Sequence, residues 1–248
     1  MTDESGQTPG EPLKEIPESI FADDDGAADA RLAQALIRFA ASRAPLSEVV
    51  DALAYARVLV PVLAHGDQRV MGKYGVEQDH VASTGVVALQ TPDGRAALPV
   101  FTDVEAMAAW NPEARPIPAE GPRAALAAVA EGWSVIVVNP SRDSVVIPRP
   151  AVWALGQGQP WQPAVVNGDV VPNVRAAIID AVPLDAHVRG IDALPGRTAE
   201  VAVIVSLVPG LGRGEVDDAV RRVHDALASS QVVADHVDGI EIRLREAS

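Results

Sequence analysis

An aromatic ring, a carboxylate and a guanidinium lie close together in one proline-containing stretch of the sequence. They belong to Trp110, Asp103 and Arg115, and Phe101 precedes them at the end of an apolar run. An aromatic plane beside a guanidinium can hold a peptide or an anion, because the ring interacts with cations and the guanidinium pairs with carboxylates. We therefore predict a binding surface at Phe101, Asp103, Trp110 and Arg115, since tryptophan and arginine are enriched at binding hot spots.

A purely structural interpretation of these residues stays open. In that case Trp110 packs over a proline-rich turn, and Arg115 pairs with Glu113 or Glu120. Asp103 would then cap the short helix expected over residues 103–109, because aspartate readily accepts a hydrogen bond from the first turn of a helix.

Two further segments carry residue types that bind ligands in other proteins. Residues 209–214 are glycine-rich between an expected strand and helix, where phosphate loops lie. Their spacing fits neither nucleotide-binding pattern, and the acidic residues that follow would repel a phosphate. A polar stretch offers nitrogen and oxygen ligands for a metal ion at His65, Asp67, Asp79 and His80. Neither pair has helical spacing, so we expect solvated loop residues, no metal and no cofactor.

The sequence shows no catalytic constellation, so any catalytic residues are unknown. It has no cysteine, which excludes thiolate catalysis and disulfides and fits a cytoplasmic protein. No Gly-x-Ser-x-Gly motif is present.

The charge balance narrows the classes of partner. The 248 residues contain 20 Lys and Arg against 34 Asp and Glu, a net charge of −14. Such a balance argues against nucleic-acid binding and against binding to an anionic membrane face. No apolar run reaches 18 residues, so we expect no membrane span.

Acidic residues are concentrated near the start of the chain, where residues 1–30 hold nine acids and one base. Few large apolar residues accompany them, so the segment cannot bury enough surface to offset its ordering entropy. We predict a disordered acidic arm over residues 1–28. Its simplest role is solubility, and the alternative role is docking on a basic partner.

The hydrophobic pattern predicts an α/β fold of the mixed α+β kind, with two small domains at residues 29–161 and 172–248. In the first domain we expect helices over 29–43, 46–56, 103–109, 122–132 and 150–155. Strands are expected there over 58–63, 83–90, 95–101, 133–138 and 145–147. Three prolines between 111 and 118 predict an extended loop. The remaining elements are a hairpin at 165–171, helices 172–181 and 214–229, and strands 185–194, 199–208 and 239–245.

A run of residues from Gly94 to Thr102 reads Gly-Arg-x-x-Leu-Pro-Val-Phe-Thr and is followed by Trp110. With residues 59–62 and 137–140, this run resembles the N-terminal domain of the SseB family, named for enhanced serine sensitivity. The resemblance covers about residues 31–160, whereas residues 172–248 resemble the family's C-terminal domain only in the order of elements. The preference for arginine, 18 against two lysines, is similar to the actinobacterial branch.

The resemblance implies a bacterial cytoplasmic α/β protein and supplies no catalytic residues. We expect a non-catalytic binding or regulatory module that contacts a protein partner through residues 101–118. The alternative is a sensor or enzyme for a small amino-acid-like metabolite, bound in a pocket between the two domains.

Overall fold

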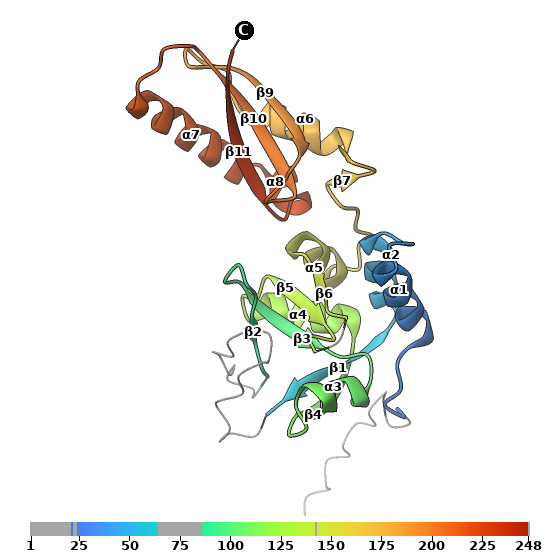
Figure 1. The fold of residues 1–248 in the computed structure, drawn as a ribbon. Helices are drawn as coiled ribbons and strands as arrows, with labels where there is room; N and C mark the ends of the chain where they lie inside the picture. Colours follow the sequence, from blue (N-terminus) through green and yellow to red (C-terminus); the bar gives the residue numbers. More distant parts are fainter. Residues whose placement is uncertain (1–20, 22–23, 64–85, 142, 248) are drawn as a thin grey trace, which may run out of the picture.

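The computed structural model describes residue 21 and residues 24–63, 86–141 and 143–247 (Figure 1). Most of the predicted acidic arm, and the predicted loop with His65, Asp67, Asp79 and His80, lie outside the described residues. The described chain has a mixed α/β fold built on several small sheets, as the sequence predicts.

A four-stranded sheet forms the centre of the N-terminal part, in the order β2-β3-β5-β6. Strands β3 and β5 are parallel, and the outer strands pair antiparallel to them. The four strands are β2 (Leu89–Gln90), β3 (Ala96–Val100), β5 (Val135–Val138) and β6 (Val145–Ile147). Gly94 closes the turn between β2 and β3 with a φ of 83°, as the Pro-Asp-Gly sequence predicts.

Alternate residues of β3 and β5 enter two different cores, because side chains alternate along a strand. One face carries Leu98, Val100 and Ile136 into the main core, against helices α1 (Ala30–Ala40), α2 (Leu46–Leu53), α4 (Gly121–Ala130) and α5 (Arg149–Gly156). The other face carries Ala97 and Val135, with Trp110 packed against them. The sequence predicts all four helices, although α1 and α2 each end about three residues earlier than expected.

Strand β1 (Arg57–Val62) pairs antiparallel with β4 (Arg115–Glu120), and α3 (Val104–Trp110) precedes β4. Part of the expected loop over 111–118 is therefore a strand, which corrects the sequence prediction. Leu59 exchanges both of its backbone hydrogen bonds with Phe101, so residues 58, 60 and 62 are the ones that face β4. Pro116 and Pro118 consequently occupy positions whose missing N–H would point away from β1, where a strand tolerates proline.

The C-terminal part contains a three-stranded sheet in the order β11-β10-β9. Strand β9 (Val188–Pro195) runs antiparallel to β10 (Val201–Leu207), whereas β11 (Ile240–Glu246) runs parallel to it. A hairpin of β7 (Val165–Val166) and β8 (Asp169–Val170) precedes the sheet. Its turn residues Asn167 and Gly168 have φ angles of 53° and 82°, as expected for Asn-Gly.

Three helices accompany this sheet: α6 (Pro172–Ala181), α7 (Arg213–Ala228) and α8 (Gln231–His236). Helix α8 was not predicted, because six residues are too few to show a helical period. In α7 the structure buries Ala219, Val223 and Leu227, which lie four residues apart on one face of the helix.

The buried hydrophobic residues of the two parts form separate cores, and the hairpin of β7 and β8 packs into the second one. The larger core takes its buried residues from positions 32–161 and the second from positions 164–237. The domain boundaries themselves stay a prediction. No helix in the described part of the chain is long and apolar enough to cross a lipid bilayer.

Candidate functional site

Trp110 lies at the end of α3, half-buried against Phe101. The two rings have centroids 5.3 Å apart and are tilted by 40°. The Phe101 side chain is fully buried, at 0% exposure, so it holds Trp110 from beneath and presents no surface of its own. Trp110 also packs against the second face of the sheet. Phe101 therefore acts on the predicted surface only by fixing the position of the Trp110 ring.

Asp103 caps α3, as the structural interpretation proposed. Its Oδ1 accepts a hydrogen bond from the backbone N–H of Ala106 at 2.7 Å. Its Oδ2 accepts a hydrogen bond from the Thr102 hydroxyl at 2.8 Å. Both carboxylate oxygens are thus engaged within the segment that carries α3. A cap of this kind stabilises the start of the helix that ends at Trp110.

Arg115 is exposed at the beginning of β4, opposite Val62. Within the described residues its guanidinium makes no ion pair or hydrogen bond. Of the two glutamates considered as partners, Glu120 pairs instead with Arg123 at 3.2 Å, and Glu113 has no ion pair with Arg115. The expected pairing of Arg115 is therefore not seen, and its charge is available to another molecule.

Asn111 separates Trp110 from the turn that leads to Arg115, and sequence reasoning missed it. It is only 4% exposed. Its Oδ1 accepts a hydrogen bond from the backbone N–H of Glu113 at 2.9 Å, while its Nδ2 finds no partner in the described chain. An unpaired buried donor is costly and uncommon, so Asn111 marks this corner as unusual. An asparagine in a proline-rich stretch gives no sequence signal of such a role.

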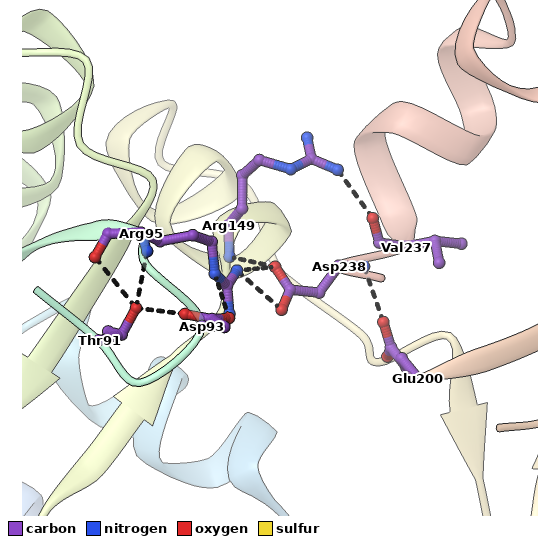
Figure 2. A network of polar contacts seen from close by, with 7 residues as sticks. All are labelled: Thr91, Asp93, Arg95, Arg149, Glu200, Val237 and Asp238. Atoms are coloured by element: carbon purple, nitrogen blue, oxygen red, sulfur yellow. Dashed lines mark hydrogen bonds and ion pairs between the residues drawn. The ribbon is translucent and has the colours of Figure 1, made fainter. Parts of the chain in front are cut away.

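A second polar cluster joins the N-terminal and C-terminal parts (Figure 2). Arg95, in the turn before β3, donates through Nη1 to both oxygens of Asp238 at 2.9 and 3.0 Å. Its Nε contacts Asp93 at 2.7 Å. The pKa of the Asp93 carboxyl lies below its ordinary value, first because it accepts from Thr91 and then because of the Arg95 charge.

Asp238 also lies at the beginning of α5. The backbone N–H of Arg149, the first residue of that helix, donates to Asp238 Oδ1 at 3.0 Å. The Arg149 guanidinium donates to the carbonyl of Val237 at 2.7 Å. The Arg95 guanidinium and the positive end of the α5 dipole thus hold one aspartate from the other part of the chain, while the Arg149 guanidinium reaches the neighbouring Val237 carbonyl, as Figure 2 shows.

Glu200 holds the same loop from the C-terminal side. Its Oε2 accepts a hydrogen bond from the Asp238 N–H at 2.8 Å, and its Oε1 accepts one from the Ala164 N–H at 3.0 Å. Burial raises the pKa of Glu200, and these two backbone donors only partly oppose that effect. Glu200 therefore ties the connection between the two cores to the loop that carries Asp238.

A cavity of about 350 Å³ lies beside this cluster. Arg149 lines it from the N-terminal part, and the C-terminal part supplies His224 and Asp238 together with Leu227, Ile240 and Ile242. The side chain of His224 is 72% exposed. The cavity combines opposite charges with an aliphatic wall.

The glycine-rich segment has a structural explanation, whereas the candidate metal ligands between residues 65 and 80 lie outside the described residues. In the glycine-rich segment, the N–H of Gly212 donates to the side chain of Glu215 at 2.8 Å, so the start of α7 is occupied by the chain's own carboxylate. Among the described residues, no group of three or more His, Asp and Glu side chains is placed to hold a metal ion.

A comparison with protein families found a match for the part of the chain that contains most of the first core. Residues 32–154 match the family model described as the SseB protein N-terminal domain. Searches of curated proteins and of solved structures found no match. The matched residues run from α1 into α5 and include Arg95, Trp110, Arg115 and Arg149. The chain therefore belongs to the SseB family, through the N-terminal domain that it carries over residues 32–154.

Proposed function

We propose that this protein is a non-catalytic binding module that holds a segment of a protein partner through the face of β4 that carries Arg115 and Ile117. The observation that carries the proposal is the exposed guanidinium of Arg115, which pairs with no described residue although glutamates are close in sequence. An arginine without an internal partner can pair with a carboxylate of another molecule and break no contact of its own. Such a charge-assisted pair is among the stronger polar contacts.

The surroundings of Arg115 indicate what kind of segment it would hold. Ile117 lies two residues along β4, on the same face of the strand, and is 49% exposed. Trp110 is held by Phe101 in a fixed position at the end of α3. Arg115 and Ile117 lie on the face of the two strands that Val60 shares, whereas Trp110 packs with Leu59 on the other face. A cation beside an exposed aliphatic side chain suits a peptide with a carboxylate next to an apolar side chain.

The outer edge of β4 argues for recognition by side chains rather than by strand addition. Pro116 and Pro118 lie at the positions whose backbone groups point away from β1. Only their carbonyl oxygens remain on that edge, so an added strand would lack half of its hydrogen bonds. Prolines at an edge generally prevent strand addition. The specificity would therefore come from Arg115 and Ile117.

The test is affinity capture from native lysate with the full chain and with Arg115→Glu. The matched control is Arg221→Glu, since Arg221 is an exposed arginine on α7. We expect a protein that the wild type and the control retain and that Arg115→Glu loses. The purified partner should then bind the wild type at least about tenfold more tightly than Arg115→Glu, a difference of about 1.4 kcal/mol. Equal capture by all three proteins would disprove the proposal.

The cavity beside Asp238 favours a second candidate, a sensor of a small amino-acid-like metabolite. Arg149 and Asp238 would pair with a carboxylate and an ammonium group, while Leu227 and Ile240 would contact an aliphatic side chain. An amino acid that binds here should raise the melting temperature of the wild type. It should not raise that of Ala228→Trp, because Ala228 is an exposed lining residue whose enlargement fills the cavity. A panel of amino acids without effect on the wild type would exclude this candidate.

A further inference from the structure

We infer that the free edge of β11 is the contact surface for a second copy of this chain. The two copies would pair their β11 strands antiparallel, with Ile242 of each on the two-fold axis. The two three-stranded sheets would then form one continuous sheet. The inference rests on the backbone, charge and apolar pattern of β11 and is independent of the function proposed above.

The backbone of β11 has one bonded side and one free side. The N–H of Val201 donates to the carbonyl of Gly239 at 3.1 Å, and the N–H of Ala247 donates to that of Leu207 at 2.7 Å. With the parallel register of β10 and β11, these bonds show that the odd-numbered residues of β11 face β10. The N–H and C=O groups of Ile240, Ile242 and Leu244 therefore point to the other side, where no described residue bonds to them. A strand edge of this kind is a template for pairing with another chain.

The charged side chains of β11 select one pairing register. Glu241, Arg243 and Arg245 lie on one face of the strand. With Ile242 on the two-fold axis, Glu241 of each copy lies opposite the partner's Arg243. Opposite charges at directly facing positions stabilise a sheet, and like charges destabilise it.

Other registers also set the unbonded N–H and C=O groups of one β11 strand opposite those of its partner, but they bring like charges together. Centring the axis on Glu241 sets the two glutamates against each other. Centring it on Arg243 pairs that arginine with itself, and centring it on Leu244 sets Arg243 against the partner's Arg245. The Arg243 register also sets Glu241 opposite the partner's Arg245, but it keeps the two Arg243 guanidinium groups face to face. Among these registers, the Ile242 register alone pairs opposite charges without setting two like charges of Glu241, Arg243 and Arg245 against each other. Its Glu241–Arg243 pairs occupy positions without backbone bonds between them, where facing side chains lie closest.

The contacts of Glu241 within its own chain stabilise the charged form of its carboxylate. Its carboxylate accepts hydrogen bonds from the backbone N–H groups of Arg197 and Thr198 at 2.9 and 3.0 Å. The same carboxylate is paired with Arg243 of its own strand. The Thr198 hydroxyl and these contacts lower its pKa to about 2. The partner's Arg243 would add a second guanidinium to a carboxylate that is held in place.

The apolar side chains on the opposite face fit the same register. Ile242 faces the partner's Ile242, and Leu244 faces the partner's Ile240. Leu244 is 47% exposed although it is a large aliphatic residue on a strand. Ile240 and Ile242 line the cavity that Leu227 also lines. Each copy therefore offers an apolar surface to the Leu244 side chain of its partner. Burying these side chains contributes free energy in proportion to the apolar area removed from water.

Sedimentation velocity of the full chain over a concentration series tests the inference. We expect the wild type to approach twice the 25.9 kDa mass of one chain. Leu244→Lys and Arg243→Glu should each raise the dissociation constant at least about tenfold, because they place a charge in the apolar contact or set two acidic residues face to face. The matched controls are Leu184→Lys and Arg221→Glu, which alter exposed residues outside β11.

Far-UV circular dichroism of each variant shows whether it is folded. At concentrations at which the wild type is monomeric, Leu244→Lys is expected to melt like the wild type, because Leu244 is 47% exposed. A wild type that remains monomeric up to about 1 mM would overturn the inference. A dimer that neither Leu244→Lys nor Arg243→Glu weakens would also overturn it, because the contact would then lie elsewhere on the chain.

Discussion

Arg95 contacts both carboxylate oxygens of Asp238, and this contact joins the turn before β3 to the loop before β11. Asp238 also accepts a hydrogen bond from the first N–H of α5. One side chain of the C-terminal part thus receives donors from two elements of the SseB domain. The side chains of Arg95 and Asp238 are 31% and 20% exposed, so water screens the pair less than it screens a surface ion pair.

Replacing Asp238 should loosen the junction. Asp238→Asn keeps the shape but removes the charge that Arg95 and α5 share. We expect the free energy of unfolding to fall by about 1–2 kcal/mol, as for lost hydrogen bonds to charged groups. Because the chain has no native cysteine, spin labels can be attached to cysteines introduced at the exposed positions Glu131 and Asp217. The distance distribution between them should broaden in Asp238→Asn and remain unchanged in the control Asp225→Asn. Equal widths in all three proteins would contradict the role of Asp238.

Glu200 should give the stability a specific pH dependence. Its pKa is raised by burial in the folded protein, so the folded state binds a proton more tightly than the unfolded state does. Folding stability therefore falls as the pH rises from the ordinary value of 4.5 through the raised pKa. Glu200→Gln cannot ionise and loses this component. The melting temperature of the wild type minus that of Glu200→Gln should decrease across this pH range, and a constant difference would contradict the prediction.

The sequence predicted the elements better than it predicted their contacts. Apolar runs, Pro122 at the start of α4 and Asn167-Gly168 in the hairpin are local signals, and the structure agrees with them. Residues 115–118 of β4 were predicted as part of an extended loop, because the three prolines of residues 111–118 exclude a helix. The prolines are tolerated because their missing N–H groups point away from β1, and this depends on the bond between Leu59 and Phe101. Such long-range pairing has no local signal.

The candidate sites show the same limit. The spacing of Trp110 and Arg115 could be read from the sequence, but the burial of Phe101 could not, because an apolar residue at a strand end occurs in either setting. Arg95 was noted only as part of the family-like run. Its partner Asp238 lies in the other half of the chain, where it is one of several exposed-looking acids. Only the folded chain shows which of them Arg95 contacts.

Replacing Gly121, the first residue of α4, should destabilise the fold. A Cβ built on it would lie 2.0 Å from the carbonyl oxygen of Leu53, which belongs to the backbone and cannot move aside easily. Gly121→Ala should therefore lower the free energy of unfolding by about 2 kcal/mol or more. Gly214→Ala is the matched control, because a Cβ there meets nothing and alanine favours a helix. Urea unfolding should show the control to be more stable by about 0.5–1 kcal/mol. A loss in both variants would contradict this account.

Substitutions of Trp110 and Arg115 should affect the free energy of unfolding differently, because Trp110 supports the fold and Arg115 is proposed to bind a partner. Trp110→Ala removes a ring that packs on Phe101 and on the second face of the sheet, so we expect the free energy of unfolding to fall by about 2–3 kcal/mol. Arg115→Glu removes no described contact and should change it by less than about 0.5 kcal/mol. Urea unfolding followed by near-UV circular dichroism measures both. The exposed Trp153 of α5 provides the control Trp153→Ala, which should cost less than Trp110→Ala. If Arg115→Glu were as destabilising as Trp110→Ala, Arg115 would be a structural residue, and its charge would not be free for a partner.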